Sequence, residues 1–111
     1  NRLINVGGQY NHVTTVTSTG PVSIDSDYLI LIDASGGNIT LTLPAASNNF
    51  MLSSGISWRF KRMDNSGNTV TIQVNGTPGT DTIDGASNFT LTTQYQSRDV
   101  MCISTSAFVL L

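Results

Sequence analysis

The sequence predicts an all-β protein, an antiparallel β-sandwich of the jelly-roll kind with about eight short strands. Three observations lead to this prediction. Thr, Val and Ile, which favour strands, are plentiful, whereas good helix formers are scarce, with no Glu and a single Lys among 111 residues. Short segments in which apolar and polar residues alternate recur along the chain. Clusters of Gly, Asn, Asp and Ser, which favour turns, separate these segments.

The length of the chain suffices for one domain with one hydrophobic core. Residues 1–22 are mostly polar. We expect them to form an N-terminal segment that continues from a larger protein and holds a first strand over residues 13–17. Residues 23–111 are predicted to form the β-sandwich domain itself.

The first elements of this domain follow in order. Residues 23–32 are predicted to form a strand or a pair of strands, and residues 33–38 a turn, because Gly and Asn tolerate positive φ. Residues 39–43 alternate Ile and Leu with Thr, the pattern of a half-buried strand. Pro44 ends this strand, since proline cannot donate a hydrogen bond to a sheet.

Residues 57–63 are predicted to form the next strand, with Trp58 and Phe60 on its core face. The cluster at 65–68 is predicted to be a hairpin turn that leads into an alternating strand over 70–74. Further strands are predicted over residues 82–83, 89–93, 100–104 and 107–111.

Three segments, 28–32, 100–103 and 107–111, are apolar on both faces of the strand that each would form. A strand with one wet face should alternate apolar and polar side chains, so neither face here favours water. In so small a protein the simplest cover for the second face is another copy of the chain. We expect a homotrimer about a three-fold axis, and a dimer stays open. The residues expected to line the interface are Tyr28, Ile30, Ile32, Met101, Ile103, Val109 and Leu111.

Phe50, Met51 and Leu52 form an apolar run inside an Asn- and Ser-rich loop. Covering each side chain would contribute roughly 1.5–3 kcal/mol, so we do not expect all three to face water. Three interpretations stay open. The loop folds back over the end of the sandwich, meets a neighbouring chain, or meets a receptor.

Arg59, Lys61 and Arg62 hold three of the five cations and form a candidate basic patch. Alternation places Arg59 and Lys61 on the strand face opposite Trp58 and Phe60. The patch could bind a sialylated or phosphorylated surface polymer, or the acidic side of a neighbouring subunit. A solvated strand face that discourages edge aggregation is the alternative.

No catalytic residue, cofactor or metal ligand is predicted. His12 is the only histidine and has no cysteine near it, so the sequence offers no zinc ligand set. Asp81 with Asp84, and Asp25 with Asp27, are the best candidates for a carboxylate pair. Both pairs lie beside Gly, Ser or Thr, where Asp commonly forms turns through its own backbone bonds.

Composition excludes further classes of function. Cys102, the only cysteine, lies in an apolar run and is expected to be a buried thiol that packs as a small hydrophobe. A net charge of -2 argues against nucleic acid, which needs a basic face. No apolar run approaches the ~20 residues that cross a bilayer, so no membrane insertion is expected.

Residues 28–46, YLILIDASGGNITLTLPAA, resemble a module that recurs in bacteriophage tail fibres, tail spikes and other virion structural proteins. FKRMDNSGNTVTI at 60–72 and DTIDG at 81–85 extend this similarity, which covers about residues 27–111. Such modules commonly close with a Ser-Asp-Gly turn followed by an aromatic. Here Ser-Thr-Ser occupies 104–106, before Phe108, so the last hairpin departs from the pattern.

This resemblance implies a trimeric, non-enzymatic viral fibre or spike head. Such a head attaches the virion to its host, binds a host-surface glycan or protein as its receptor, and acts outside the cell. Three alternatives stay open. They are a structural trimerisation cap or capsid-associated protein without receptor binding, a carbohydrate-binding module of a hydrolase, and the trimeric head of a collagen-like or TNF-like protein.

Overall fold

The computed structural model describes residues 13–22, 29–47, 57–75 and 81–111, and this part of the chain is all-β with no helix. The all-β prediction is therefore confirmed there. The strands are β1 (Val13–Val16), β2 (Gly20–Pro21), β3 (Leu29–Ile32), β4 (Ile39–Thr42), β5 (Ser57–Arg62), β6 (Val70–Gln73), β7 (Thr82–Ile83), β8 (Asn88–Leu91), β9 (Ser97–Cys102) and β10 (Ala107–Leu110).

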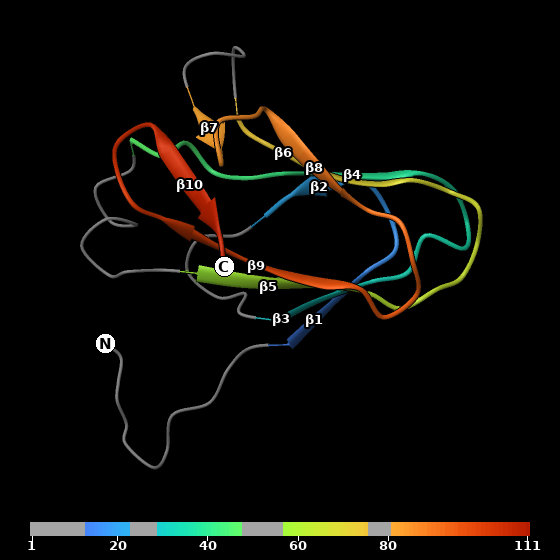
Figure 1. The fold of residues 1–111 in the computed structure, drawn as a ribbon. Coiled ribbons are helices and arrows are strands. Elements are labelled where there is room, and N and C mark those ends of the chain that lie inside the picture. Colours follow the sequence, from blue (N-terminus) through green and yellow to red (C-terminus); the bar gives the residue numbers. More distant parts are fainter. Residues whose placement is uncertain (1–12, 23–28, 48–56, 76–80) are drawn as a thin grey trace.

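The strands form two sheets (Figure 1). The six-stranded sheet has the order β1-β3-β5-β9-β10-β7, and the four-stranded sheet has the order β2-β4-β6-β8. From β1 to β6 the chain alternates between the sheets, so it winds as three stacked coils. β1, β3 and β5 are parallel to one another, and so are β2, β4 and β6. This winding is that of a short β-solenoid.

The last four strands close these coils mainly with antiparallel pairs. β8 runs antiparallel to β6, and β9 antiparallel to β5. β10 returns antiparallel to β9 and lies parallel to β7 at the sheet edge. The sheets are therefore mixed, and the prediction of an antiparallel sandwich is wrong for the first six strands.

The cause of the difference lies in the turns. Residues 65–68, predicted to be a hairpin turn, instead join β5 of one sheet to β6 of the other. Residues 33–38 join β3 to β4 in the same way. Each of these connections carries the chain from one sheet to the other. After two crossings the chain is back in the first sheet, where the new strand runs in the same direction as the earlier one and pairs with it in parallel.

The two short N-terminal strands belong to these sheets. β1 pairs with β3 and β2 with β4, although both precede residue 23, where the predicted β-sandwich domain begins. Val22, which follows β2, is buried in the core. The coil that residues 13–22 begin therefore packs with the others.

The core fills the space between the two sheets. The alternating strands predicted over 39–43 and 70–74 place their Ile, Leu and Val side chains inward, as expected. Trp58 and Phe60 are buried as predicted, with the Trp58 ring centroid 6.3 Å from that of Phe108. The largest fully buried apolar side chains are Trp58, Phe60, Phe108, Ile30, Ile32, Ile39, Leu41, Leu43, Ile72 and Ile83.

Candidate functional site

The three residues of the predicted basic patch do not lie on one surface. Arg59 and Lys61 lie on the outer face of β5, opposite Trp58 and Phe60, as the alternation predicted. Arg62 does not belong to this patch, because only 2% of it is exposed. It has the same parity along β5 as Trp58 and Phe60, so the strand directs it inward. That parity was visible in the sequence and could have identified Arg62 as a buried arginine.

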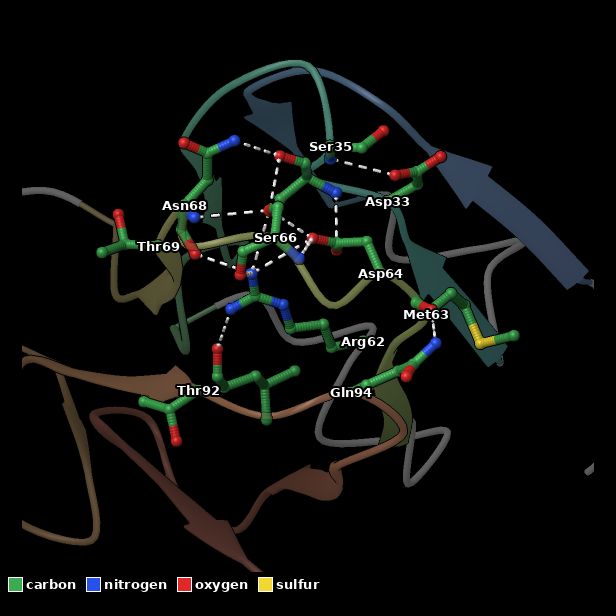
Figure 2. Close-up of polar contacts among 12 residues, drawn as sticks. Asp33, Ser35, Arg62, Met63, Asp64, Ser66, Asn68, Thr69, Thr92 and Gln94 are labelled. Carbon is green, nitrogen blue, oxygen red and sulfur yellow. Dashed lines mark hydrogen bonds and ion pairs between the residues drawn. The ribbon is translucent and has the colours of Figure 1, made fainter.

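Figure 2 shows the hydrogen bonds that hold the Arg62 guanidinium. Its Nη1 donates to the carbonyl of Leu91 over 2.8 Å. Its Nη2 lies 3.1 Å from a carboxylate oxygen of Asp64 and also donates to the carbonyls of Ser66 and Asn68, at 2.9 and 2.7 Å. A buried charge of this kind is tolerable only when it is paired and hydrogen-bonded.

Asp64 is the anionic partner in this network. Its second carboxylate oxygen accepts the amide N–H of Ala34 over 2.8 Å, and the first accepts the amide and hydroxyl of Ser66. Burial by itself would raise the pKa of Asp64. The hydrogen bonds from Ser66, Ala34 and Arg62 outweigh burial and lower the pKa far below its ordinary value of 3.8.

The network joins three turns at one end of the molecule. Asp64 holds the 33–38 turn through Ala34, whose carbonyl also accepts from the Asn68 side chain over 2.6 Å. Arg62 reaches Leu91 at the end of β8. The backbone of Arg62 also bonds the segment between β8 and β9, because its carbonyl accepts from Tyr95 and its amide donates to Gln96. Arg62, Asp64, Ser66 and Asn68 hold these turns together, and we call these four residues the Arg62 clamp.

The outer surface of β5 and β9 carries the remaining charges of this region. Arg59 and Asp99 occupy paired positions on these strands and form a two-pronged ion pair, with Nε–Oδ1 and Nη2–Oδ2 distances of 2.7 and 3.0 Å. The hydrogen bond from Arg59 lowers the pKa of Asp99. The pair compensates the charge of Arg59.

Tyr95 lies in a tight turn beside this surface, between β8 and β9. The carbonyl of Thr93 accepts the amide of Gln96 over 3.2 Å, and Tyr95 has a φ of 68° while Gln94 does not have a positive φ. These values place Tyr95 at the third position of a type II turn, which normally requires Gly or Asn. A tyrosine with this φ costs about 1–2 kcal/mol.

A network of hydrogen bonds maintains this conformation. The amide of Tyr95 donates to the carbonyl of Arg62 over 2.6 Å, and the Gln94 side chain donates to the carbonyl of Met63. The side-chain oxygen of Gln96 accepts the amide of Thr92 over 2.7 Å. The turn is therefore fixed directly against the Arg62 clamp. Strain that its surroundings maintain in this way is typical of functional positions.

Tyr95 is 59% exposed, and the ammonium of Lys61 lies over its ring, 5.7 Å from the centroid. This cation–π geometry orients both side chains on the outer surface. Within the described residues Lys61 makes no salt bridge with an aspartate. We call Lys61, Tyr95 and the adjacent Arg59–Asp99 pair the outer patch. The alternation of apolar and polar residues does not identify Tyr95, which lies between two strands. Tyr95 is distinguished by its positive φ, which the turn imposes.

The predicted oligomer interface is divided between the core and the surface. Ile30 and Ile32 are buried in the core of the single chain, so they are not available to a three-fold axis. This corrects the expectation for these two residues. Their neighbours Leu29 and Leu31 face outward instead and are half-buried.

Other predicted interface residues lie further along the six-stranded sheet. Met101 and Val109 are paired on the outer faces of β9 and β10 and are half-buried. Ile103 and Leu111 are 55% and 68% exposed. Tyr28 lies outside the described residues.

Several other candidates also lie outside the described residues. They are the apolar loop residues Phe50, Met51 and Leu52, and also His12, Asp25 and Asp27.

Asp81, Asp84 and Cys102 each form hydrogen bonds with the backbone of the fold. Asp84 occupies a turn at φ 50°, followed by Gly85 at φ 83°, and its carboxylate accepts the amide of Leu110 over 3.1 Å. Asp81 is buried and accepts the amide of Ala46 over 3.0 Å. Cys102 is buried as predicted, and burial raises the pKa of its thiol.

In the part of the chain that the structure describes, no three His, Cys, Asp or Glu side chains gather as a metal would require. The described residues also include no helix long and apolar enough to span a membrane. In comparisons with known proteins, no protein-family model matches the chain. No curated protein matches it at a significant level either.

Proposed function

We propose that this chain is a non-enzymatic head domain of a viral fibre or spike. It attaches the virion to the host surface as a homotrimer and acts outside the cell. The sequence resemblance to phage fibre modules supports the viral context. The structural observation that supports assembly is the outer face of the six-stranded sheet, which carries apolar side chains that the single chain covers only in part.

The pairing register shows how this outer face is composed. Leu29 lies beside Arg59, and Arg59 beside Asp99, so a paired charge separates the apolar residues of β3 from those of β9 and β10. On the far side, Met101 lies beside Val109. Met101 and Val109, with the exposed Ile103 and Leu111, form the apolar end of this face. We place the contact between copies at this apolar end, where burial contributes affinity. Lys61 and Tyr95 lie at the opposite end of β5 and β9 and stay outside the contact.

Assembly is testable with a charge placed on this face. We expect Val109→Asp to convert the trimer to monomers, because an aspartate buried between copies would be left unpaired. The matched control is Thr90→Asp, an exposed position on β8 of the other sheet, which should leave the trimer intact. Light scattering and sedimentation equilibrium over roughly a hundredfold range of concentration measure the result. A parent chain that is monomeric throughout this range would contradict the proposed assembly.

Attachment is testable by incubating the labelled parent protein with envelope fractions from permissive and non-permissive hosts. Binding to the permissive fraction alone, lost with Val109→Asp, supports an adhesive head, because three weak sites on one rigid body gain avidity. A stable trimer that binds none of the fractions would show that the chain is a structural trimerisation cap instead.

A further inference from the structure

We propose that the outer patch is a saccharide-binding site, in which Tyr95 stacks on a sugar ring and Lys61 binds a carboxylate carried by the same sugar. This inference rests on the proposed attachment function and deepens it. It names the chemical class of the receptor, an acidic glycan such as one with a sialic acid or a hexuronic acid residue.

The first reason is the position of Tyr95. The residue is mostly exposed, and its backbone occupies a conformation that glycine or asparagine would adopt without strain. The core gains nothing from this ring, since it lies on the surface. An aromatic ring kept exposed at a strained position is explained by a ligand that uses its face. Tyrosine suits this role because it offers a large apolar area and loses little conformational entropy on binding.

The second reason is the charge beside the ring. Arg59 is compensated by Asp99 in the two-pronged pair, whereas Lys61 is held over the Tyr95 ring without an aspartate partner in the described part of the chain. Among the described residues, the outer patch therefore carries one more positive than negative charge. A single carboxylate on a ring stacked against Tyr95 would complement it.

The third reason is rigidity. Tyr95 donates its amide to Arg62 over 2.6 Å, and the Gln94 and Gln96 side chains hold the turn on both sides. The backbone that carries the ring is thus fixed before binding, so a ligand loses less free energy in ordering the turn. The site lies open on the surface, so we expect a dissociation constant on the order of 1 mM for one site. Three sites in a trimer would multiply this weak affinity into useful avidity.

The experiment is a titration of the isotope-labelled protein followed by two-dimensional NMR. The probes are sialyllactose, a trigalacturonate, and neutral lactose. We expect shifts centred on Lys61, Tyr95 and Gln96 with at least one acidic probe, and about fivefold weaker binding of lactose. Tyr95→Asn should weaken the acidic probe roughly tenfold, while Tyr95→Phe should stay within about twofold of the parent.

Two further variants separate ligand binding from folding. Lys61→Gln should remove the preference for acidic over neutral sugars, and Thr90→Asn, an exposed position on β8 of the other sheet, should change nothing. The melting temperature of Tyr95→Asn should lie within roughly 5 °C of the parent, because the relieved strain offsets the lost ring contact. If Tyr95→Asn does not fold, Lys61→Gln decides the question, because an unchanged preference for acidic sugars in that variant would overturn the inference.

The inference is overturned if neither acidic probe shifts the outer patch, or if Tyr95→Asn binds as the parent does. In that case, host binding that survives Tyr95→Asn would leave the attachment function standing on another surface. Conversely, saccharide binding at Tyr95 without binding to any host fraction would overturn the attachment function alone. Response to sialyllactose points to a cell-surface glycoconjugate, and response to trigalacturonate to an acidic polysaccharide.

Discussion

Replacing Arg62 with methionine is expected to lower the free energy of unfolding by about 3–5 kcal/mol. Methionine fills a similar volume and keeps the apolar part of the side chain, so the loss comes from the missing charge and donors. Asp64 would lose its cationic partner, and the carbonyls of Ser66, Asn68 and Leu91 would each lose a donor. Urea denaturation measures this loss as a lower midpoint with an unchanged slope.

Arg59→Met is the matched control, because Arg59 lies on the same strand and also pairs with an aspartate. Its side chain is 48% exposed, so we expect a loss of at most about 1 kcal/mol. Equal losses for the two variants would contradict the role of the Arg62 clamp in holding the three turns.

Replacing Asp64 with asparagine is expected to lower the free energy of unfolding by about 2–4 kcal/mol at neutral pH. The asparagine NH₂ group would face an N–H or O–H group whose hydrogen bond the carboxylate now accepts. The Arg62 charge would be left buried without its anion. The double variant Arg62→Met with Asp64→Asn should lose less than the sum of the two single losses, since both residues act in one network. Strict additivity would argue against that coupling.

The same substitution should change how stability depends on pH. The folded-state pKa of Asp64 lies far below the ordinary value of 3.8, so the unfolded chain takes up the proton first as the pH falls. The contribution of Asp64 is therefore fully present above about pH 5 and is lost progressively in more acidic solution. The difference in stability between the parent and Asp64→Asn should shrink between roughly pH 5 and pH 2. A difference that stays constant over this range would contradict the lowered pKa.

Local patterns predicted most of the strands and their inward faces. Ile39, Leu41 and Leu43 alternate with threonines, and the structure buries all three. The strand predicted over 57–63 is observed as β5, with Trp58 and Phe60 in the core. Such patterns depend only on the alternation of side chains along one strand, so a single sequence contains them.

The direction of pairing could not be predicted in the same way. Val13 pairs with Leu29, but Leu29 pairs with Arg59, so successive coils differ in length and no fixed repeat is visible. A turn such as 65–68 has the same composition whether it closes a hairpin or crosses to the other sheet. Which of the two it does depends on packing between distant strands.

The candidate site shows the same division. Grouping Arg59, Lys61 and Arg62 by proximity in sequence predicted one basic patch, whereas strand alternation already separated Arg62 from the others. The ion pair of Arg59 with Asp99 could not be predicted without the register of β5 against β9. The position of Lys61 over the Tyr95 ring depends in addition on the turn that precedes β9.

The sequence by itself determined that the protein is built from short strands with apolar inner faces, because each strand's preference is local. Only the tertiary structure decided that the first six strands wind in parallel coils, that Arg62 clamps three turns, and that Tyr95 is displayed beside Lys61. These features arise from contacts between segments far apart in the chain, and the free energy of such contacts depends on how the whole chain packs.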